Sequence, residues 1–384
     1  MTVGIVQETA EGETRVALVP QHVPSVLKLA DTVLVQSGSG TASGYPDDDY
    51  AERGGKVVPT REEVLKEADV LLRVRSGAAS PDSAEDLRTV KEGSTIVGFL
   101  DPYTPHESFT AMIERKIASF SMELVPRITR AQSMDALSAM ANLAGYKSVL
   151  IAAGELPKMF PMMMTAAGTI VPAKVFIVGV GVAGLQAIAT AKRLGAVVSA
   201  YDIRPAVKDQ VKSLGAKFVE MDLGTEDAEG SGGYAKEMTE DFYRKQRELM
   251  TETIRESDVV ITTAAVPGKR APVLVTEDMV RAMKPGSVVV DLGAERGGNC
   301  ELTKPGETVN VEGVRIVGPI NVPASMPFDA SQLYSKNIST FLQTIVQEKA
   351  LHIDMEDEIV AASVVTHNGS VPNEQTRARL GTEE

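Results

Sequence analysis

Three glycines, Gly179, Gly181 and Gly184, follow the apolar stretch Lys174–Val178 and open a helical pattern. In that setting the first glycine permits a tight turn, the second lets the backbone approach a pyrophosphate, and the third lets helix and strand pack closely. The amide groups and the positive dipole end of the helix then face the phosphates. A glycine-rich turn without a ligand is the alternative. The pattern predicts a dinucleotide site on Gly179, Val180, Gly181, Val182, Ala183 and Gly184.

The next predicted strand, Val197–Tyr201, ends at Asp202. A carboxylate at this strand end accepts hydrogen bonds from the adenosine ribose hydroxyls and repels a 2′-phosphate, which favours NAD over NADP. Arg204 leaves three alternatives, because it could pair with Asp202, stack on adenine or tolerate a phosphate. We expect NAD(H) to be the cofactor, with Asp202, Ile203 and Arg204 at its adenosine end.

Two later segments could complete this site. Strand ends line the ligand crevice in such sheets, so the residues after Val259–Thr262 could form the floor beneath a ribose. These residues are Ala264, Ala265, Val266 and Pro267. The glycine-rich stretch Leu223–Ala235 could close over the cofactor as a lid, or could be a disordered surface insertion. Asp291–Glu295 follows the next strand, where a polar turn is an equal alternative.

A second group of polar side chains lies in Glu123–Ser138. Ser133 or Asp135 could cap the helix that follows. Capping does not account for Arg127 and Gln132. An Arg–Asp pair beside an amide can hold a carboxamide in one orientation, so a functional site and a helix cap both remain open.

Composition limits the classes of protein that this chain can belong to. The 384 residues carry a formal charge of −13, which disfavours nucleic acid and anionic lipid as partners. The lone cysteine, Cys300, fits a reducing compartment, and the four histidines show no metal-ligand spacing, so no metal is expected. No secretion signal and no apolar run of about 18 residues is present, so we expect no insertion into a bilayer.

Short apolar runs alternate with helical patterns along most of the chain, which predicts largely parallel sheets covered by helices. The expected strands are Thr2–Val6, Thr32–Gln36, Val70–Val74, Thr95–Phe99, Ile117–Met122, Lys174–Val178, Val197–Tyr201, Val259–Thr262, Val288–Asp291 and Arg315–Val317. The expected helices include His22–Ala30, Arg61–Ala68, Glu107–Arg115, Ser133–Leu156, Val182–Leu194, Pro205–Ser213 and Asp329–Gln347.

This order indicates an α/β chain of two Rossmann-like, doubly wound domains, the second inserted in the first. We expect residues 1–135 with 330–384 to form the first domain and residues 136–329 to form the dinucleotide-binding domain. The run Met162–Met164 is typical of packing or of a contact surface. The polar segment Thr366–Glu384 is expected to be a flexible end.

The stretch Arg127–Asp135, RITRAQSMD, resembles the signature loop of the NAD(H)-binding component of proton-translocating nicotinamide nucleotide transhydrogenases. The resemblance covers nearly the whole chain. Other matching stretches are Asn142–Tyr146, Phe160–Gly168, Gly179–Lys192, Gly232–Met238 and Gly297–Cys300.

The resemblance implies roles for individual residues. Arg127, Gln132, Asp135 and Ser138 would hold the reacting nicotinamide and its ribose. Ile128 and Thr129 would lie beside the cofactor. A mobile loop would close on NAD(H) through Gly232, Gly233, Tyr234 and Met238.

The resemblance also implies an activity and partners. Hydride would pass directly from NADH to NADP+, with NADP(H) bound only by a partner subunit, and the transfer would be coupled to proton movement. The chain would form a homodimer that meets NADP(H)-binding and membrane-spanning subunits. It would lie on the cytoplasmic side of the inner membrane as a peripheral component, active only with those subunits.

The same family is related to alanine dehydrogenase, and Glu13–Ala17 resembles a start that both share. An amino-acid dehydrogenase needs an acid/base group and a cation beside its substrate. The resemblance places Arg75 near the relative's substrate lysine and Asp101 near its catalytic histidine. Arginine cannot shuttle a proton near neutral pH, and an exposed aspartate is ionised. These replacements argue against a soluble amino-acid dehydrogenase, which stays as the alternative.

Overall fold

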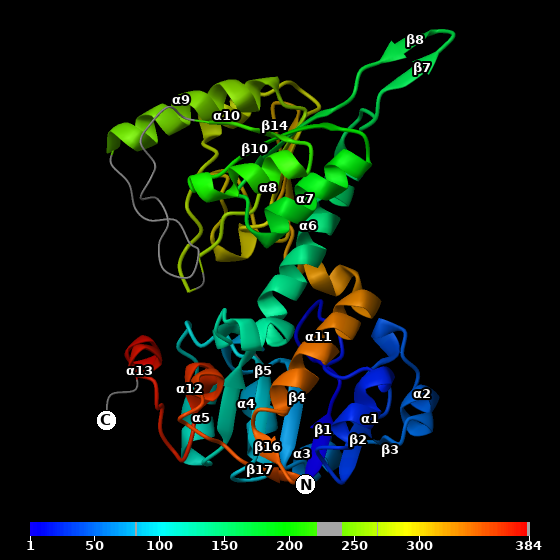
Figure 1. The fold of residues 1–384 in the computed structure, drawn as a ribbon, viewed down its shortest axis with the longest axis vertical. Coiled ribbons are helices and arrows are strands. Elements are labelled where there is room, and N and C mark those ends of the chain that lie inside the picture. Colours follow the sequence, from blue (N-terminus) through cyan, green and yellow to red (C-terminus); the bar gives the residue numbers. More distant parts are fainter. Residues whose placement is uncertain (81–82, 221–239, 267, 382–384) are drawn as a thin grey trace. The chain divides into compact units, whose positions relative to one another are not determined.

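The computed structural model describes residues 1–80, 83–220, 240–266 and 268–381. The chain divides into two compact units (Figure 1). Unit 1 comprises Met1–Met140 and Pro323–Glu384, and unit 2 comprises Ala141–Val322. Among the described residues, each unit contains a seven-stranded, largely parallel sheet. The predicted α/β class with two Rossmann-like sheets is therefore confirmed.

The sheet of unit 1 has the order β18-β6-β5-β4-β1-β2-β3, and β18 alone among these strands runs antiparallel to its neighbour. Its strands are β1 (Thr2–Ile5), β2 (Thr32–Gln36), β3 (Lys56–Val58), β4 (Val70–Arg75), β5 (Thr95–Phe99), β6 (Ala118–Ser121) and β18 (Val364–Thr366). Its helices are α1 (Val23–Val26), α2 (Asp47–Glu52), α3 (Arg61–Glu67), α4 (Ser83–Thr89), α5 (Glu107–Glu114), α11 (Pro327–Leu342), α12 (Glu358–Ser363) and α13 (Glu374–Leu380). The central strands are buried apolar runs, as expected where helices cover both faces of a parallel sheet.

The sheet of unit 2 has the order β11-β10-β9-β12-β13-β15-β14, with an antiparallel pair at the β14 edge. Its strands are β9 (Lys174–Val178), β10 (Val197–Tyr201), β11 (Lys217–Phe218), β12 (Val259–Thr262), β13 (Val288–Asp291), β14 (Thr308–Val311) and β15 (Val314–Val317). Its helices are α7 (Val182–Arg193), α8 (Lys208–Ser213), α9 (Glu240–Glu256) and α10 (Glu277–Arg281). The strand order reverses at β9, and the glycine turn follows that strand. In open α/β sheets this is the position of the ligand crevice.

Three sequence predictions about unit 1 are wrong. The helix expected at His22–Ala30 is reduced to α1, which has proline in its first turn. The helix expected to reach Gln347 ends at Leu342, because Glu348 and Lys349 adopt positive φ in the turn between β16 (Val346–Gln347) and β17 (Ala350–Leu351).

The expected flexible end is the third wrong prediction, since Thr366 belongs to β18 and α13 follows it. Asn373 caps α13 by accepting a hydrogen bond from the Thr376 amide, and Leu380 is buried. The polar composition of this segment therefore reflects a solvated helix face and its caps.

Helix α6 (Ala136–Glu155) has 20 residues and, by length and composition, could cross a membrane. A single helix of this kind is weak evidence for a membrane span, because the core helix of a soluble protein passes the same test. Val149 and Ala152 of α6 are fully buried in the hydrophobic core of unit 2. That burial accounts for some of its apolar character.

The hairpin of β7 (Met163–Thr165) and β8 (Gly168–Ile170) extends away from the body of unit 2 (Figure 1). All of its strand residues are exposed, and Met164 is 75% exposed. Of the two predictions for Met162–Met164, packing within the chain is therefore wrong. A contact surface stays a prediction.

Candidate functional site

The glycine turn of unit 2 joins β9 to α7, which begins directly after Gly181. Gly179 has φ +96°, a conformation that other residues rarely adopt, and a Cβ there would lie 2.9 Å from Thr263 Oγ1. A Cβ on Gly184 would clash with the Gly179 carbonyl oxygen, whereas one on Gly181 would meet nothing within 4 Å. Two glycines thus satisfy packing, and the third leaves an open surface. That geometry fits the approach of a pyrophosphate to backbone amides.

Asp202 is tied to this turn and to Arg204. Its Oδ2 accepts from the Val180 amide at 2.7 Å and from Arg204 Nη2 at 2.9 Å. Its Oδ1 accepts from the Arg204 amide and from Arg204 Nε, each at 2.9 Å. Of the three alternatives for Arg204, the structure has the pairing. A carboxylate offers about four acceptor positions, so a ribose diol would compete with the guanidinium for Asp202.

Two loops flank the turn from the neighbouring strands β12 and β13. Thr263 Oγ1 donates to the Gly179 carbonyl at 2.8 Å. Asn299 Nδ2 donates to the Ala264 carbonyl at 2.9 Å and to the Pro272 carbonyl at 2.8 Å, so its amide fixes the backbone after β12. Neither Thr263 nor Asn299 was predicted from the sequence. Their only signal is that polar residues follow strand ends.

Asp291 forms the interior of the turn after β13. This fully buried carboxylate accepts hydrogen bonds from Thr262 Oγ1, the Gly293 amide, the Cys300 amide and Thr303 Oγ1, at 2.7–2.9 Å. All its acceptor positions are used within the chain, so the polar-turn alternative describes Asp291.

Several predicted site residues have less definite surroundings. Ile203 and Val266 are half-buried, and Ala265 is exposed. The remaining ones, Gly232, Gly233, Tyr234, Met238 and Pro267, lie outside the described residues.

The polar group of unit 1 surrounds the start of α6. Asp135 Oδ1 accepts from the Ser138 amide at 2.8 Å, and Oδ2 accepts from Ser138 Oγ at 2.6 Å. Asp135 is thus the helix cap that its sequence position allowed. Arg127 and Gln132 have exposed side chains. The structure brings Asp135 and Ser138 together and leaves Gln132 at the surface, on a 3₁₀ helix that spans Thr129–Met134 and follows Ile128.

A buried ion cluster lies at the carboxyl ends of β1 and β4. Glu13 Oε2 accepts from Arg15 Nη2 at 2.6 Å and from Arg75 Nε at 3.1 Å. Burial raises the pKa of Glu13, but the hydrogen bond and charge of Arg15 outweigh it, so the pKa lies below its ordinary value. Arg75, which the resemblance places near a substrate lysine, is therefore already bonded to a buried carboxylate.

Asp101, the other position that distinguishes the two candidate chemistries, follows β5 with φ +48°. Its amide donates to Glu123 Oε1 at 2.9 Å, and the Leu100 amide donates to Glu123 Oε2 at 3.1 Å. Burial raises the pKa of Glu123. The carboxyl of Glu123 thus fixes the backbone that carries Asp101.

Comparison with known proteins decides the family. Residues 4–144 match the N-terminal domain, and residues 148–374 the C-terminal domain, of the family described as alanine dehydrogenase/PNT. The chain belongs to the alanine dehydrogenase/PNT family.

Within the alanine dehydrogenase/PNT family, the chain is 46% identical over 374 residues to the first of the polypeptides that form NAD(P) transhydrogenase subunit alpha in Rhodospirillum rubrum, covering 97% of each chain. The crystal structure of transhydrogenase from Sinorhizobium meliloti has a TM-score of 0.87 and 47% identity, covering 97% of this chain and 100% of that one. Alanine dehydrogenase of Mycobacterium tuberculosis is 27% identical, over 99% of this chain and 97% of its own. The resemblance found in the motifs is confirmed.

Proposed function

We propose that this chain is the NAD(H)-binding subunit of a proton-translocating transhydrogenase, and that hydride passes directly from its NADH to NADP+ on a partner subunit. The open glycine turn with Asp202 bonded to it carries the proposal for NAD(H). The 46% identity to a transhydrogenase alpha subunit polypeptide supports the proposal for the reaction. The wider complex, with its NADP(H)-binding and membrane-spanning subunits and its location on the cytoplasmic side of the inner membrane, belongs to the same proposal.

The residues assigned to the adenosine diphosphate end lie in unit 2. The amides of Gly179–Gly184 would hold the pyrophosphate, and Asp202, Ile203 and Arg204 the adenosine ribose. Ala264–Pro267 would form the floor of the crevice, with Ala264 held by Asn299.

The residues assigned to the nicotinamide end position a ring. Bound NADH supplies the hydride at its C4 atom. Arg127 and Gln132 would hold the carboxamide, and Asp135 and Ser138, already bonded to each other, would hold the ribose. Direct transfer between two rings needs contact and orientation, with no protein nucleophile or general acid. Proton movement would belong to the membrane-spanning subunit, coupled by conformational change.

An alanine dehydrogenase-like reaction is the second candidate, and the unit 1 geometry disfavours it. That chemistry requires a group that exchanges a proton beside a substrate-binding cation. Arg75 cannot exchange a proton near neutral pH, and its Nε is bonded to the buried carboxylate of Glu13.

The experiment mixes the chain with NADH and an NADP+ analogue, with and without an NADP(H)-binding transhydrogenase subunit. We expect analogue reduction only in the mixture, and no NAD+ reduction with alanine. Gln132→Asn should slow transfer far more than it weakens NADH binding. Alanine-dependent reduction by the chain alone would overturn the proposal in favour of the second candidate, and NADH binding with no turnover in either condition would reduce the chain to a binding module.

A further inference from the structure

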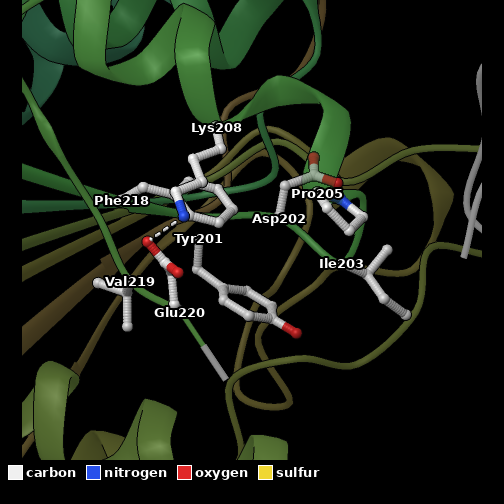
Figure 2. A pocket seen from close by; sticks show the side chains of 8 residues that line it. All are labelled: Tyr201, Asp202, Ile203, Pro205, Lys208, Phe218, Val219 and Glu220. Atoms are coloured by element: carbon white, nitrogen blue, oxygen red, sulfur yellow. Dashed lines mark ion pairs between the residues drawn. The ribbon is translucent and has the colours of Figure 1, made fainter. Parts of the chain in front are cut away.

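A small cavity opens beside Asp202, between the segment after β10 and the end of β11 (Figure 2). Its volume is about 100 Å³, enough for a few water molecules or one phosphate-sized group. It is lined by Tyr201, Asp202, Ile203, Pro205, Lys208, Phe218, Val219 and Glu220. Among these described lining residues Lys208 is the only cation.

Both cations of this segment are paired with carboxylates. Lys208 Nζ lies 2.7 Å from Glu220 Oε1, as Figure 2 shows on one side of the cavity. Arg204 Nε lies 2.9 Å from Asp202 Oδ1. The formal charges of the four groups cancel. The segment that would meet a group attached to the ribose 2′-oxygen therefore presents no net positive charge.

From these contacts we infer that Glu220 is a second residue that determines preference for NAD(H) over NADP(H), acting through Lys208. The inference rests on the proposed function, because it presumes that Asp202 faces the adenosine ribose. A 2′-phosphate carries between one and two negative charges near neutral pH, and sites for it supply an arginine or a similar cation. In this chain Glu220 occupies the cation that the cavity could otherwise offer.

The strength of the Lys208–Glu220 pair decides how this preference works. The two side chains are 34% and 52% exposed, and ion pairs of that exposure are weak. A 2′-phosphate could therefore displace Glu220 from Lys208. It would then lie near two carboxylates, Glu220 and Asp202, whose repulsion would oppose it. Discrimination thus comes from charge near the cavity.

The test compares NADH and NADPH affinity of the full chain by nucleotide-fluorescence titration. We expect Glu220→Gln to raise the ratio of NADPH affinity to NADH affinity by about tenfold, the effect of one unopposed charge near a protein surface. Adding Lys208→Gln to that variant should abolish the gain, because the freed cation is then gone. A tenfold gain that survives Lys208→Gln would overturn the role of Lys208.

The matched control is Glu256→Gln. Glu256 pairs with Lys174 at 3.0 Å, also exposed, at the opposite end of β9 from the glycine turn. It removes the same charge from the same unit, so the affinity ratio should not change. An equal gain in this control, or an unchanged ratio in Glu220→Gln, would overturn the inference while NADH binding persists. Failure of the wild-type chain to bind NADH would instead refute the proposed function beneath it.

Discussion

Asp202 shows how one carboxylate can join a strand end to the turn beside it. Its oxygens accept from Val180 and Arg204, and its side chain is only 7% exposed. The carboxylate therefore fixes the turn before any nucleotide arrives. A residue identified from the sequence as a ribose acceptor also belongs to the scaffold that shapes the turn.

Asp202→Asn should weaken NADH binding by roughly 10- to 100-fold, because hydrogen bonds to charged groups contribute about 1.5–3 kcal/mol. An amide also presents a donor where Val180 and Arg204 already donate. Isothermal titration calorimetry measures the change. Asp209→Asn, an exposed aspartate on α8, is the control and should bind NADH normally. Affinity within twofold of wild type in Asp202→Asn would remove this carboxylate from the site.

At the scale of elements, the sequence predicts what local pattern encodes. β9 and β10 have the predicted bounds, because apolar runs ending in a glycine turn or an aspartate are local signals. β18 was missed because its position depends on pairing with β6, which is remote in the chain. Thr263 was missed likewise, since it bonds Gly179 across the sheet and no local pattern announces it.

The contact of α6 with the glycine turn depends on one glycine. A Cβ on Gly145 would clash with the Ala183 carbonyl oxygen, whereas a Cβ on Gly154 of the same helix would meet nothing within 4 Å. Gly145→Ala should destabilise the fold by about 1–3 kcal/mol through overpacking and should weaken NADH binding. Gly154→Ala should stabilise it by about 0.5–1 kcal/mol. Thermal unfolding measures both, and equal midpoints would contradict the close packing.

The buried ion pairs of unit 1 should make stability depend on acid. Burial raises the pKa of Asp86, but hydrogen bonds and charges from Arg61 and Arg73 outweigh it and lower the pKa. The pKa of Glu13 is lowered in the same way by Arg15. A depressed folded pKa stabilises above the unfolded value and loses this contribution as pH falls. The thermal midpoint should therefore drop as pH falls below about 4.5, with a shallower slope in Asp86→Asn. A flat wild-type profile would contradict these pairings.

At the scale of the whole molecule, the β7–β8 hairpin is the strongest sign of assembly. It exposes Met162, Met164, Ile170 and Val171 at 40–75%. Contiguous exposed apolar side chains mark contact surfaces in soluble proteins. We therefore connect the proposed homodimer with this hairpin.

The double variant Met164→Asp/Ile170→Asp should convert the dimer to a monomer, because paired carboxylates cannot be buried in an apolar interface without cost. Light scattering should give twice the 40.9 kDa chain mass for the wild type and one chain mass for the variant. Val273→Asp changes an equally apolar residue that is 48% exposed elsewhere in unit 2, and it should stay dimeric. A dimeric hairpin variant would exclude this surface.

The transfer of hydride from one nicotinamide to another is the central claim, and an isotope label tests it most directly. The chain, an NADP(H)-binding partner subunit, NADP+ and NADH deuterated at C4 on the transferred face would be mixed in ordinary water. Mass spectrometry of the NADPH formed should find the deuterium at its nicotinamide ring, because no solvent proton takes part. NADPH without deuterium, or deuterium released to water, would contradict direct transfer.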